Sequence, residues 1–197
     1  MMRQTIWLLV LSCALAVVAS AQEELKQGVY AGEERREIKS LSAEEVEGLL
    51  NGQGMGLAKA AELNHYPGPR HVLDLAAELQ LTPEQRTQTQ AAFDRMRSEA
   101  VRLGRRIVER ERALNAMFAK GDIDEGKLHT ATSEIAQLQG ALRAAHLAAH
   151  LEMRRILSPG QVKKYDELRG YAAGLKTGGA HGHGHGKHSG RRKYSKT

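Results

Sequence analysis

The sequence is poor in aromatic residues, proline and cysteine. Its 197 residues include only 4% Phe, Trp and Tyr, four prolines and a single cysteine. So few aromatic side chains argue against the strands of an all-β sandwich or barrel, and against a surface that stacks bases or sugars. Because Cys13 stands alone near the start, the chain has no disulfide framework, no CxxC motif and no thiol nucleophile in its body.

Long apolar runs are also missing, except at the start of the chain. Arg3 precedes an apolar run over residues 6–19, and Ala19-Ser20-Ala21 then offers an A-x-A cleavage site. The run is shorter than the roughly 20 residues that cross a bilayer. We therefore expect residues 1–21 to be a cleaved secretory signal peptide and the protein to be periplasmic. A lipoprotein signal that uses Cys13 and an uncleaved anchor are the alternatives.

The excess of positive charge is confined to the end of the chain. Residues 22–175 contain 22 Lys and Arg against 23 Asp and Glu, whereas residues 176–197 contain six basic residues and no acidic one. A DNA-binding domain would carry its basic patch on a folded element. The near-neutral body and the predicted export therefore argue against nucleic acid as a partner.

The region ahead of the centre predicts only short helices. Residues 22–39 are polar and charged, and we expect them to be poorly ordered. Ser42 and Glu45 form a capping-box pattern at the start of a helix that ends near Leu50. A weaker helical pattern follows over residues 55–63, and a further helix is expected over residues 70–79.

The centre carries two long apolar seams. Thr82, Pro83 and Gln85 mark a helix start, and apolar residues then recur every three or four positions as far as Lys120-Gly121. The first seam consists of Phe93, Met96, Ala100, Leu103, Ile107, Leu114 and Met117, and the second of Leu128, Ala131, Ile135, Leu138, Leu142, Ala145, Ala149, Met153 and Ile156. A connection of only a few residues joins them, so the two helices should be antiparallel neighbours.

The predicted fold is therefore all-α. We expect a long antiparallel helical hairpin over residues 83–119 and 124–157, with short flanking helices, in a dimer. Met96, Leu103, Ile107, Leu138, Leu142 and Met153 are the predicted core. The N-terminal segment and the C-terminal tail are expected to be disordered.

The same helix-start pattern occurs twice. The two copies consist of Leu81, Thr82 and Gln85 and of Leu157, Ser158 and Gln161. Antiparallel pairing places both copies at one end of the hairpin. Two L-[ST]-P-x-Q copies that flank a helical hairpin behind a signal peptide resemble the Spy/CpxP family of LTxxQ-motif periplasmic proteins, with its ZraP/CnrX-like heavy-metal-resistance group. The second copy departs from the pattern by having Ser158 in place of threonine.

This resemblance covers about residues 70–171. It implies a cradle-shaped helical dimer, ATP-independent chaperone action on unfolding envelope proteins and, in some members, metal binding. The chain then divides into a signal peptide (1–21), a polar N-terminal segment with short helices (22–69), a Spy/CpxP-like helical domain (70–173) and a His-rich basic tail (174–197).

Arginines and leucines of the hairpin form the candidate client-binding surface. Arg102, Arg105 and Arg106 lie in an arginine-rich stretch, where charge would attract an unfolded chain before apolar contact holds it. Leu147 and Leu151 lie outside the main apolar stripe and need a partner subunit or a client. The alternative is a solvated helix face held by ion pairs.

Histidines supply two candidate metal sites. His146 and His150 are one helical turn apart on one face, a spacing at which two imidazoles can bind one ion. The alternative is a pair of interfacial histidines with ordinary hydrogen bonds. Further ligands would come from residues 93–97 of the first long helix, where Asp94 and Met96 are candidates.

The tail provides the second site. It carries His181, His183, His185 and His188 among glycines. Imidazoles suit Zn, Ni, Cu or Co, and without a fixed geometry the affinity should be modest and the selectivity poor. The alternative is a basic tail that binds metal only incidentally.

These features together predict a non-enzymatic periplasmic envelope-stress protein. It would be an ATP-independent chaperone that holds unfolded or misfolded envelope proteins and binds divalent transition metals, with no obligatory cofactor. A metal sensor or buffer that signals heavy-metal resistance to a membrane-bound sensor is the second hypothesis, and a structural envelope protein is the third.

Overall fold

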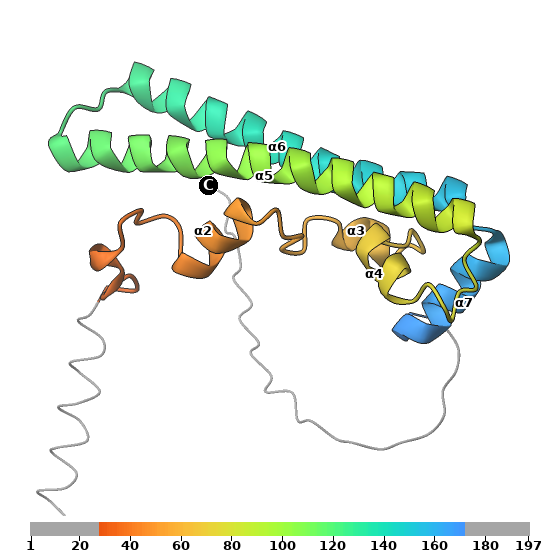
Figure 1. Ribbon diagram of the computed structural model, residues 1–197. Coiled ribbons are helices and arrows are strands. Elements are labelled where there is room, and N and C mark those ends of the chain that lie inside the picture. Colours follow the sequence, from red (N-terminus) through yellow and green to blue (C-terminus); the bar gives the residue numbers. More distant parts are fainter. Residues whose placement is uncertain (1–27, 172–197) are drawn as a thin grey trace, which may run out of the picture.

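The computed structural model describes residues 28–171, and all the regular structure in that range is helical. The elements in chain order are η1 (Glu33–Arg35), α2 (Ala43–Leu50), α3 (Lys59–Glu62), α4 (Pro69–Asp74), α5 (Pro83–Lys120), α6 (Glu125–Ile156) and α7 (Pro159–Arg169). The long helices α5 and α6 lie antiparallel, with α2, α3 and α4 along one side of the hairpin and α7 at its open end (Figure 1). The predictions for the leader 1–21 and the tail 174–197 concern residues outside the described range.

Capping residues define the two ends of the hairpin. The hydroxyl of Thr82 accepts a hydrogen bond from the backbone N–H of Gln85, and the Gln85 side chain accepts one from the N–H of Thr82, both at 3.1 Å. Helix α5 ends where Gly121 adopts φ 67°, a conformation that glycine tolerates best. Asp124 then caps α6 by accepting a hydrogen bond from the N–H of Lys127 at 2.8 Å. The predicted hairpin is thereby confirmed, with boundaries within one residue.

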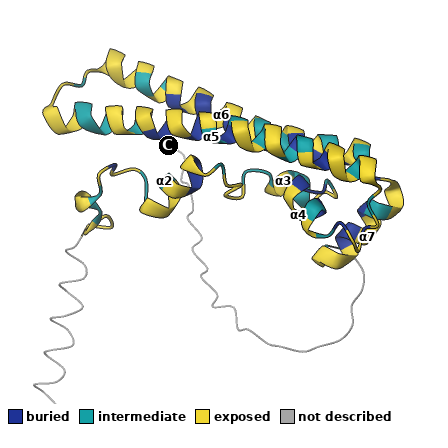
Figure 2. Cartoon of the chain, in the orientation of Figure 1, coloured by how far each residue is buried: buried dark blue, intermediate teal, exposed yellow. Residues whose placement is uncertain are grey.

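The core follows the two seams. Figure 2 shows the buried positions where α5 and α6 face each other and again on α7. Five of the six predicted core residues are buried, and only Met96 is half-buried. A second cluster around Tyr165, which is fully buried, joins α4 and α7 to the open end of the hairpin. The dimer remains a prediction.

The segment ahead of α2 is more ordered than the sequence suggested. Ile38 is buried to 3% exposure in the cluster that contains Leu103 and Ile107. Polar contacts also join this segment to α5, including an ion pair of 2.8 Å between Glu37 and Arg112. The prediction of poor order over residues 22–39 is therefore wrong for the part around Ile38, where one apolar side chain among charged ones anchors the segment.

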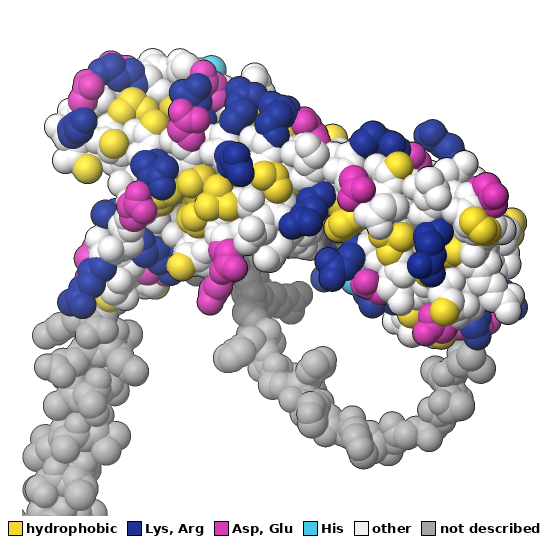
Figure 3. Space-filling model, viewed as in Figure 1, with side chains coloured by type: hydrophobic (Ala, Val, Ile, Leu, Met, Phe, Trp, Pro, Cys, Tyr) yellow, Lys and Arg dark blue, Asp and Glu magenta, His cyan; other side chains and the backbone are white. Residues whose placement is uncertain are grey.

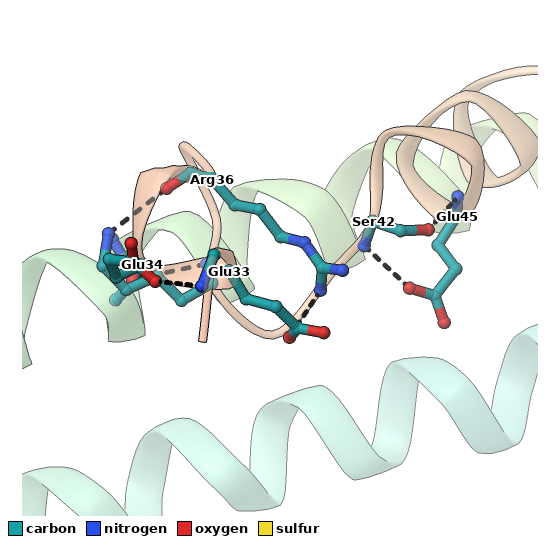
Figure 4. Close-up of polar contacts among 8 residues, drawn as sticks. Glu33, Glu34, Arg36, Ser42 and Glu45 are labelled. Carbon is teal, nitrogen blue, oxygen red and sulfur yellow. Dashed lines mark hydrogen bonds and ion pairs between the residues drawn. The ribbon is translucent and has the colours of Figure 1, made fainter. Parts of the chain in front are cut away.

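Local polar contacts shape the same segment. Figure 4 shows the ion pair between Arg36 and Glu33, at 2.8 Å, and the capping box in which Ser42 and Glu45 bind each other's backbone N–H groups. The capping box confirms the predicted start of α2. The box lies at the N-terminus of α2, the helix that packs against α5.

The chain between α2 and α5 turns more often than the sequence predicted. Helix α3 has four residues and α4 ends at Asp74, whereas longer helices were expected over residues 55–63 and 70–79. Positive φ angles at Met55, His65 and Gln80 bend the backbone between them. These turns bring residues 62–68 against α6. Among the described residues, no helix combines the length and the apolar composition needed to cross a membrane.

Candidate metal site

The two histidines predicted as ligands lie on the inner face of α6. His146 is 4% exposed and His150 is 8% exposed, although both carry polar rings. Leu142, Ala149 and Met153 of the same helix are buried with them, because all five follow the three- and four-residue spacing of the second seam. The helix therefore directs both imidazoles to the side covered by the α3–α4 region.

The hydrogen bond made by His150 defines its tautomer. Its Nδ1 lies 2.7 Å from the backbone carbonyl oxygen of Tyr66. A carbonyl only accepts, so Nδ1 must carry the proton and donate it. In the neutral ring this leaves the lone pair on Nε2, the nitrogen that would face an ion. Such a bond from the far nitrogen to a carbonyl is a common way to orient a metal-binding histidine.

His146 presents a nitrogen without a partner. Its Nε2 is buried and makes no hydrogen bond within the described structure. Burial lowers the pKa of this imidazole below its ordinary value, and the nearby ring of His150 lowers it further. His146 is therefore neutral at pH 7, which is the form that binds a metal ion. A metal ion would satisfy this orphaned nitrogen, and His150 lies one helical turn away on the same face of α6.

Glu62 of α3 is the carboxylate nearest to this pair. Its Oε2 lies 3.7 Å from Nδ1 of His150, beyond hydrogen-bonding range, since that nitrogen is engaged with Tyr66. Its Oε1 accepts a hydrogen bond of 2.5 Å from the hydroxyl of Tyr165 and lies 3.7 Å from Nε of Arg169. Burial and the bond to Glu62 raise the pKa of Tyr165, which therefore stays a donor. Glu62 thus ties α3 to α7.

An open groove of about 960 Å³ adjoins the histidines. It is lined by residues of the α3–α4 region, α5, α6 and the end of α7, and both His146 and His150 contribute to its wall. A Cβ atom at Gly68 would lie 3.0 Å from Cε1 and 3.2 Å from Nε2 of His150. The glycine therefore leaves free the space beside the nitrogen that carries the lone pair.

Of the two further ligands predicted for this site, Asp94 and Met96, only Met96 lines the groove. Met96 is half-buried and lines the groove, whereas Asp94 is exposed and accepts a hydrogen bond of 2.9 Å from Gln90. Within residues 28–171, no three His, Cys, Asp or Glu side chains are placed to hold one ion. The histidines at positions 181, 183, 185 and 188 lie outside the described residues.

Sequence reasoning missed Glu62 and Tyr66. Both lie in a short irregular stretch whose position over α6 depends on several turns. The sequence offered one signal for Glu62, because it is the only acidic residue between Glu47 and Asp74.

The predicted client-binding residues have mixed surroundings. Arg102, Arg105 and Arg106 are all exposed, and Arg102 is paired with Glu99 at 2.6 Å. Leu147 is half-buried, and Leu151 is 49% exposed. Figure 3 shows hydrophobic side chains gathered in the middle of one face, with Lys and Arg side chains around them.

Comparison with known proteins gives one match. A protein-family model described as heavy-metal resistance matches residues 53–164, more than half of the chain. The matched range contains α3, α4, α5 and α6, and therefore Glu62 and both buried histidines. No curated protein and no solved structure matches the chain.

Proposed function

The chain belongs to the heavy-metal-resistance family, and from this premise we propose that it is a non-enzymatic periplasmic protein that binds a divalent transition metal through His146 and His150. The ion would be Zn, Ni, Cu or Co, the metals that imidazole nitrogens suit. Its role would be that of a metal buffer or sensor in heavy-metal resistance.

The observation that carries this proposal is the unpartnered Nε2 of the buried His146, one helical turn from His150 on the same face of α6. Leaving a buried polar atom without a hydrogen bond costs stability, roughly 1–3 kcal/mol, so such atoms are rare unless they serve another purpose. A metal ion would satisfy both nitrogens at once. The carbonyl of Tyr66 supports the site by holding the His150 ring in the required tautomer.

Metal titration tests this function in the full-length chain with His181, His183, His185 and His188 each changed to Ala, so that the tail histidines do not mask the result. Replacing both histidines, as His146→Ala with His150→Ala, should weaken zinc or nickel binding about tenfold or more, because two ligands are lost. His129→Ala is the matched control, since it removes an exposed histidine from the same helix at a distance of roughly 25 Å. Competition with a chelating dye measures the affinity. Unchanged tight binding in the double variant would mean that both histidines are purely structural.

Chaperone activity is the second candidate function, and the exposed apolar surface favours it. Leu151 is 49% exposed and Phe118 is 57% exposed, while Arg105 and Arg106 stand exposed on α5. Cationic and apolar side chains exposed on the same hairpin suit the capture of an unfolded envelope protein, first by charge and then by apolar contact. Dimerisation would bring two such surfaces together.

A charge reversal tests the chaperone hypothesis. Arg105→Glu with Arg106→Glu should slow client capture at low salt, as followed by light scattering of an aggregating client with and without metal. Arg102→Glu is a useful third change, because it also breaks the ion pair with Glu99. Full suppression of aggregation by the triple variant at low salt would exclude this face as the client surface.

A further inference from the structure

Met96 of α5 brings a methionine side chain to the groove that His146 and His150 also line. This side chain is half-buried and packs against the apolar cluster around Leu103. The Nε2 of His146 is buried and makes no hydrogen bond within residues 28–171. The wall of the groove therefore offers, besides the imidazoles, a donor of a different kind, the neutral and polarizable thioether sulfur.

The pairing of α5 with α6 sets Met96 level with the histidines. An ion pair of 2.6 Å joins Arg95 to Glu152 and marks where the two antiparallel helices stand side by side. Met96 is one position further along α5, and His150 is two positions back along α6, which is the same direction along the hairpin. At about 1.5 Å per residue, Met96 and His150 lie at about the same level, with His146 one turn farther.

A divalent ion finds an incomplete set of donors in this groove. Structural zinc sites have about four nitrogen, oxygen or thiolate ligands. Within residues 28–171, no three His, Cys, Asp or Glu side chains are placed to hold one ion. The nearest carboxylate, Glu62, already accepts the Tyr165 hydroxyl and faces Arg169. The groove therefore suits an ion that two imidazoles and one uncharged donor can satisfy.

The charges around the groove favour an ion of low charge. The lining residues include more basic than acidic side chains, namely Lys59, Arg70, Arg97 and Arg169 against Glu62 and Asp74. Asp74 accepts a hydrogen bond of 3.3 Å from Arg70, and Glu62 lies 3.7 Å from Arg169, so both carboxylates already face a cation. Because the Coulomb energy is proportional to the charge of the ion, the excess cations repel a divalent ion about twice as strongly as a monovalent one.

We propose that this groove selects a soft monovalent ion, Cu(I), which is held by the imidazole nitrogens of His146 and His150 and by the thioether sulfur of Met96. Thioether ligands select Cu(I), and imidazole also suits copper. All three ligands are neutral, and monovalent copper is satisfied by fewer ligands than zinc. This inference rests on the proposed metal-binding function and adds to it a preference for Cu(I) over the divalent ions.

Cu(I) and zinc binding to variants of one full-length background test this selection. The background carries Cys13→Ser and lacks the tail histidines, so that neither a thiol nor the tail competes for the ion. The tail positions changed to Ala are His181, His183, His185 and His188. Met96→Leu removes the sulfur but keeps an apolar side chain of similar size. Met55→Leu is the matched control, because Met55 also lines the groove. A Cu(I)-specific chelating dye, used anaerobically with a reductant, measures the affinity.

The selection predicts a loss that is specific to one ion. Met96→Leu should weaken Cu(I) binding roughly tenfold or more and leave zinc binding and helix content unchanged, because only the soft ion uses the sulfur. Met55→Leu should alter neither affinity. Unchanged Cu(I) affinity in Met96→Leu, or a background that binds zinc as tightly as Cu(I), would overturn the selection and leave the proposed function intact. Tight binding of either ion by His146→Ala with His150→Ala would overturn the proposed function itself.

NMR of methyl-labelled methionine shows which sulfur binds. Ag(I), a soft monovalent ion that needs no reductant, should shift the Cε methyl signal of Met96 further than zinc does. The signal is assigned by its loss in Met96→Leu, and Met117, roughly 30 Å farther along α5, is the internal reference. A silver-dependent shift of the Met55 signal in place of the Met96 signal would overturn the role of Met96. No shift of either signal would overturn the thioether ligand.

Discussion

Gln85 and Gln161 lie 76 positions apart and hold each other in a reciprocal pair, in which the Nε2 of each donates to the Oε1 of the other at 2.9 Å. Each side chain also accepts a hydrogen bond from the N–H of its own N-cap residue. Gln85 additionally donates to the carbonyl of Ile156, and Gln161 to that of Leu79. The repeated motif therefore caps two helices and joins their starting points, which gives a physical reason for its duplication.

Breaking this pair should destabilise the open end of the hairpin. Gln85→Ala should lower the free energy of unfolding by about 1–3 kcal/mol, because partly buried amide groups lose their partners. Gln161→Ala should act similarly, and the two losses should overlap in the double variant by about 0.5–3 kcal/mol. Urea unfolding followed by circular dichroism measures these values. Gln137→Ala, on the exposed face of α6, is the control. Strictly additive losses would show that the two amides act independently.

The contact between α2 and α5 depends on a glycine. A Cβ atom at Gly104 would lie 2.0 Å from the backbone oxygen of Leu49, so the two helices touch backbone to backbone. Gly104→Ala should therefore displace α2 and lower the free energy of unfolding by about 1–3 kcal/mol. Gly140→Ala is the matched control, since nothing lies within 4 Å of a Cβ there. It should stabilise α6 by about 0.5–1 kcal/mol. Equal effects of the two substitutions on unfolding would contradict the close contact.

Local sequence signals predicted the hairpin well. The caps at Thr82, Asp124 and Ser158 are formed by residues within a few positions of each other, and the seams repeat over many turns. Both kinds of signal are strong because they depend on neighbouring residues alone. The one-turn spacing of His146 and His150 likewise placed them on one face of the helix.

The surroundings of the candidate site were not predictable in the same way. Glu62 and Tyr66 reach α6 through turns at Met55 and His65, and methionine is not a residue type that signals positive φ in a sequence. The anchoring of Ile38 likewise depends on its packing against Leu49, Leu103 and other distant residues of one cluster, which no local pattern encodes. Asp94 was chosen as a ligand from hairpin pairing alone, whereas the segment before α4 occupies the space beside His150.

The hydroxyl of Tyr165 should contribute to the stability of the α3–α7 contact. It donates to Glu62 at 2.5 Å and accepts from the N–H of Gly68 at 3.4 Å, while the ring is fully buried. Tyr165→Phe should lower the free energy of unfolding by about 1–3 kcal/mol, since Glu62 loses a donor in a partly buried site. Hydrogen exchange should also accelerate around residue 68. Tyr30→Phe, at an exposed position, is the control, and equal protection around residue 68 in the two variants would refute this role.

The lowered pKa of His146 should make the metal-free protein sensitive to mild acid. Because burial lowers the pKa of this ring in the folded state, the unfolded chain binds its proton at a higher pH, near the ordinary value of about 6.5. Below that value the unfolded state holds more protons, so the free energy of unfolding falls as the pH decreases until the folded pKa is passed. Urea unfolding in the presence of a chelator, at about pH 7.5 and pH 5.5, measures the loss. His146→Gln cannot be protonated and should lose less stability over this interval than the unmodified chain, whereas His129→Gln should lose as much. If His146→Gln loses as much stability as the unmodified chain, another group causes the acid sensitivity. The lowered pKa of His146 would then be contradicted.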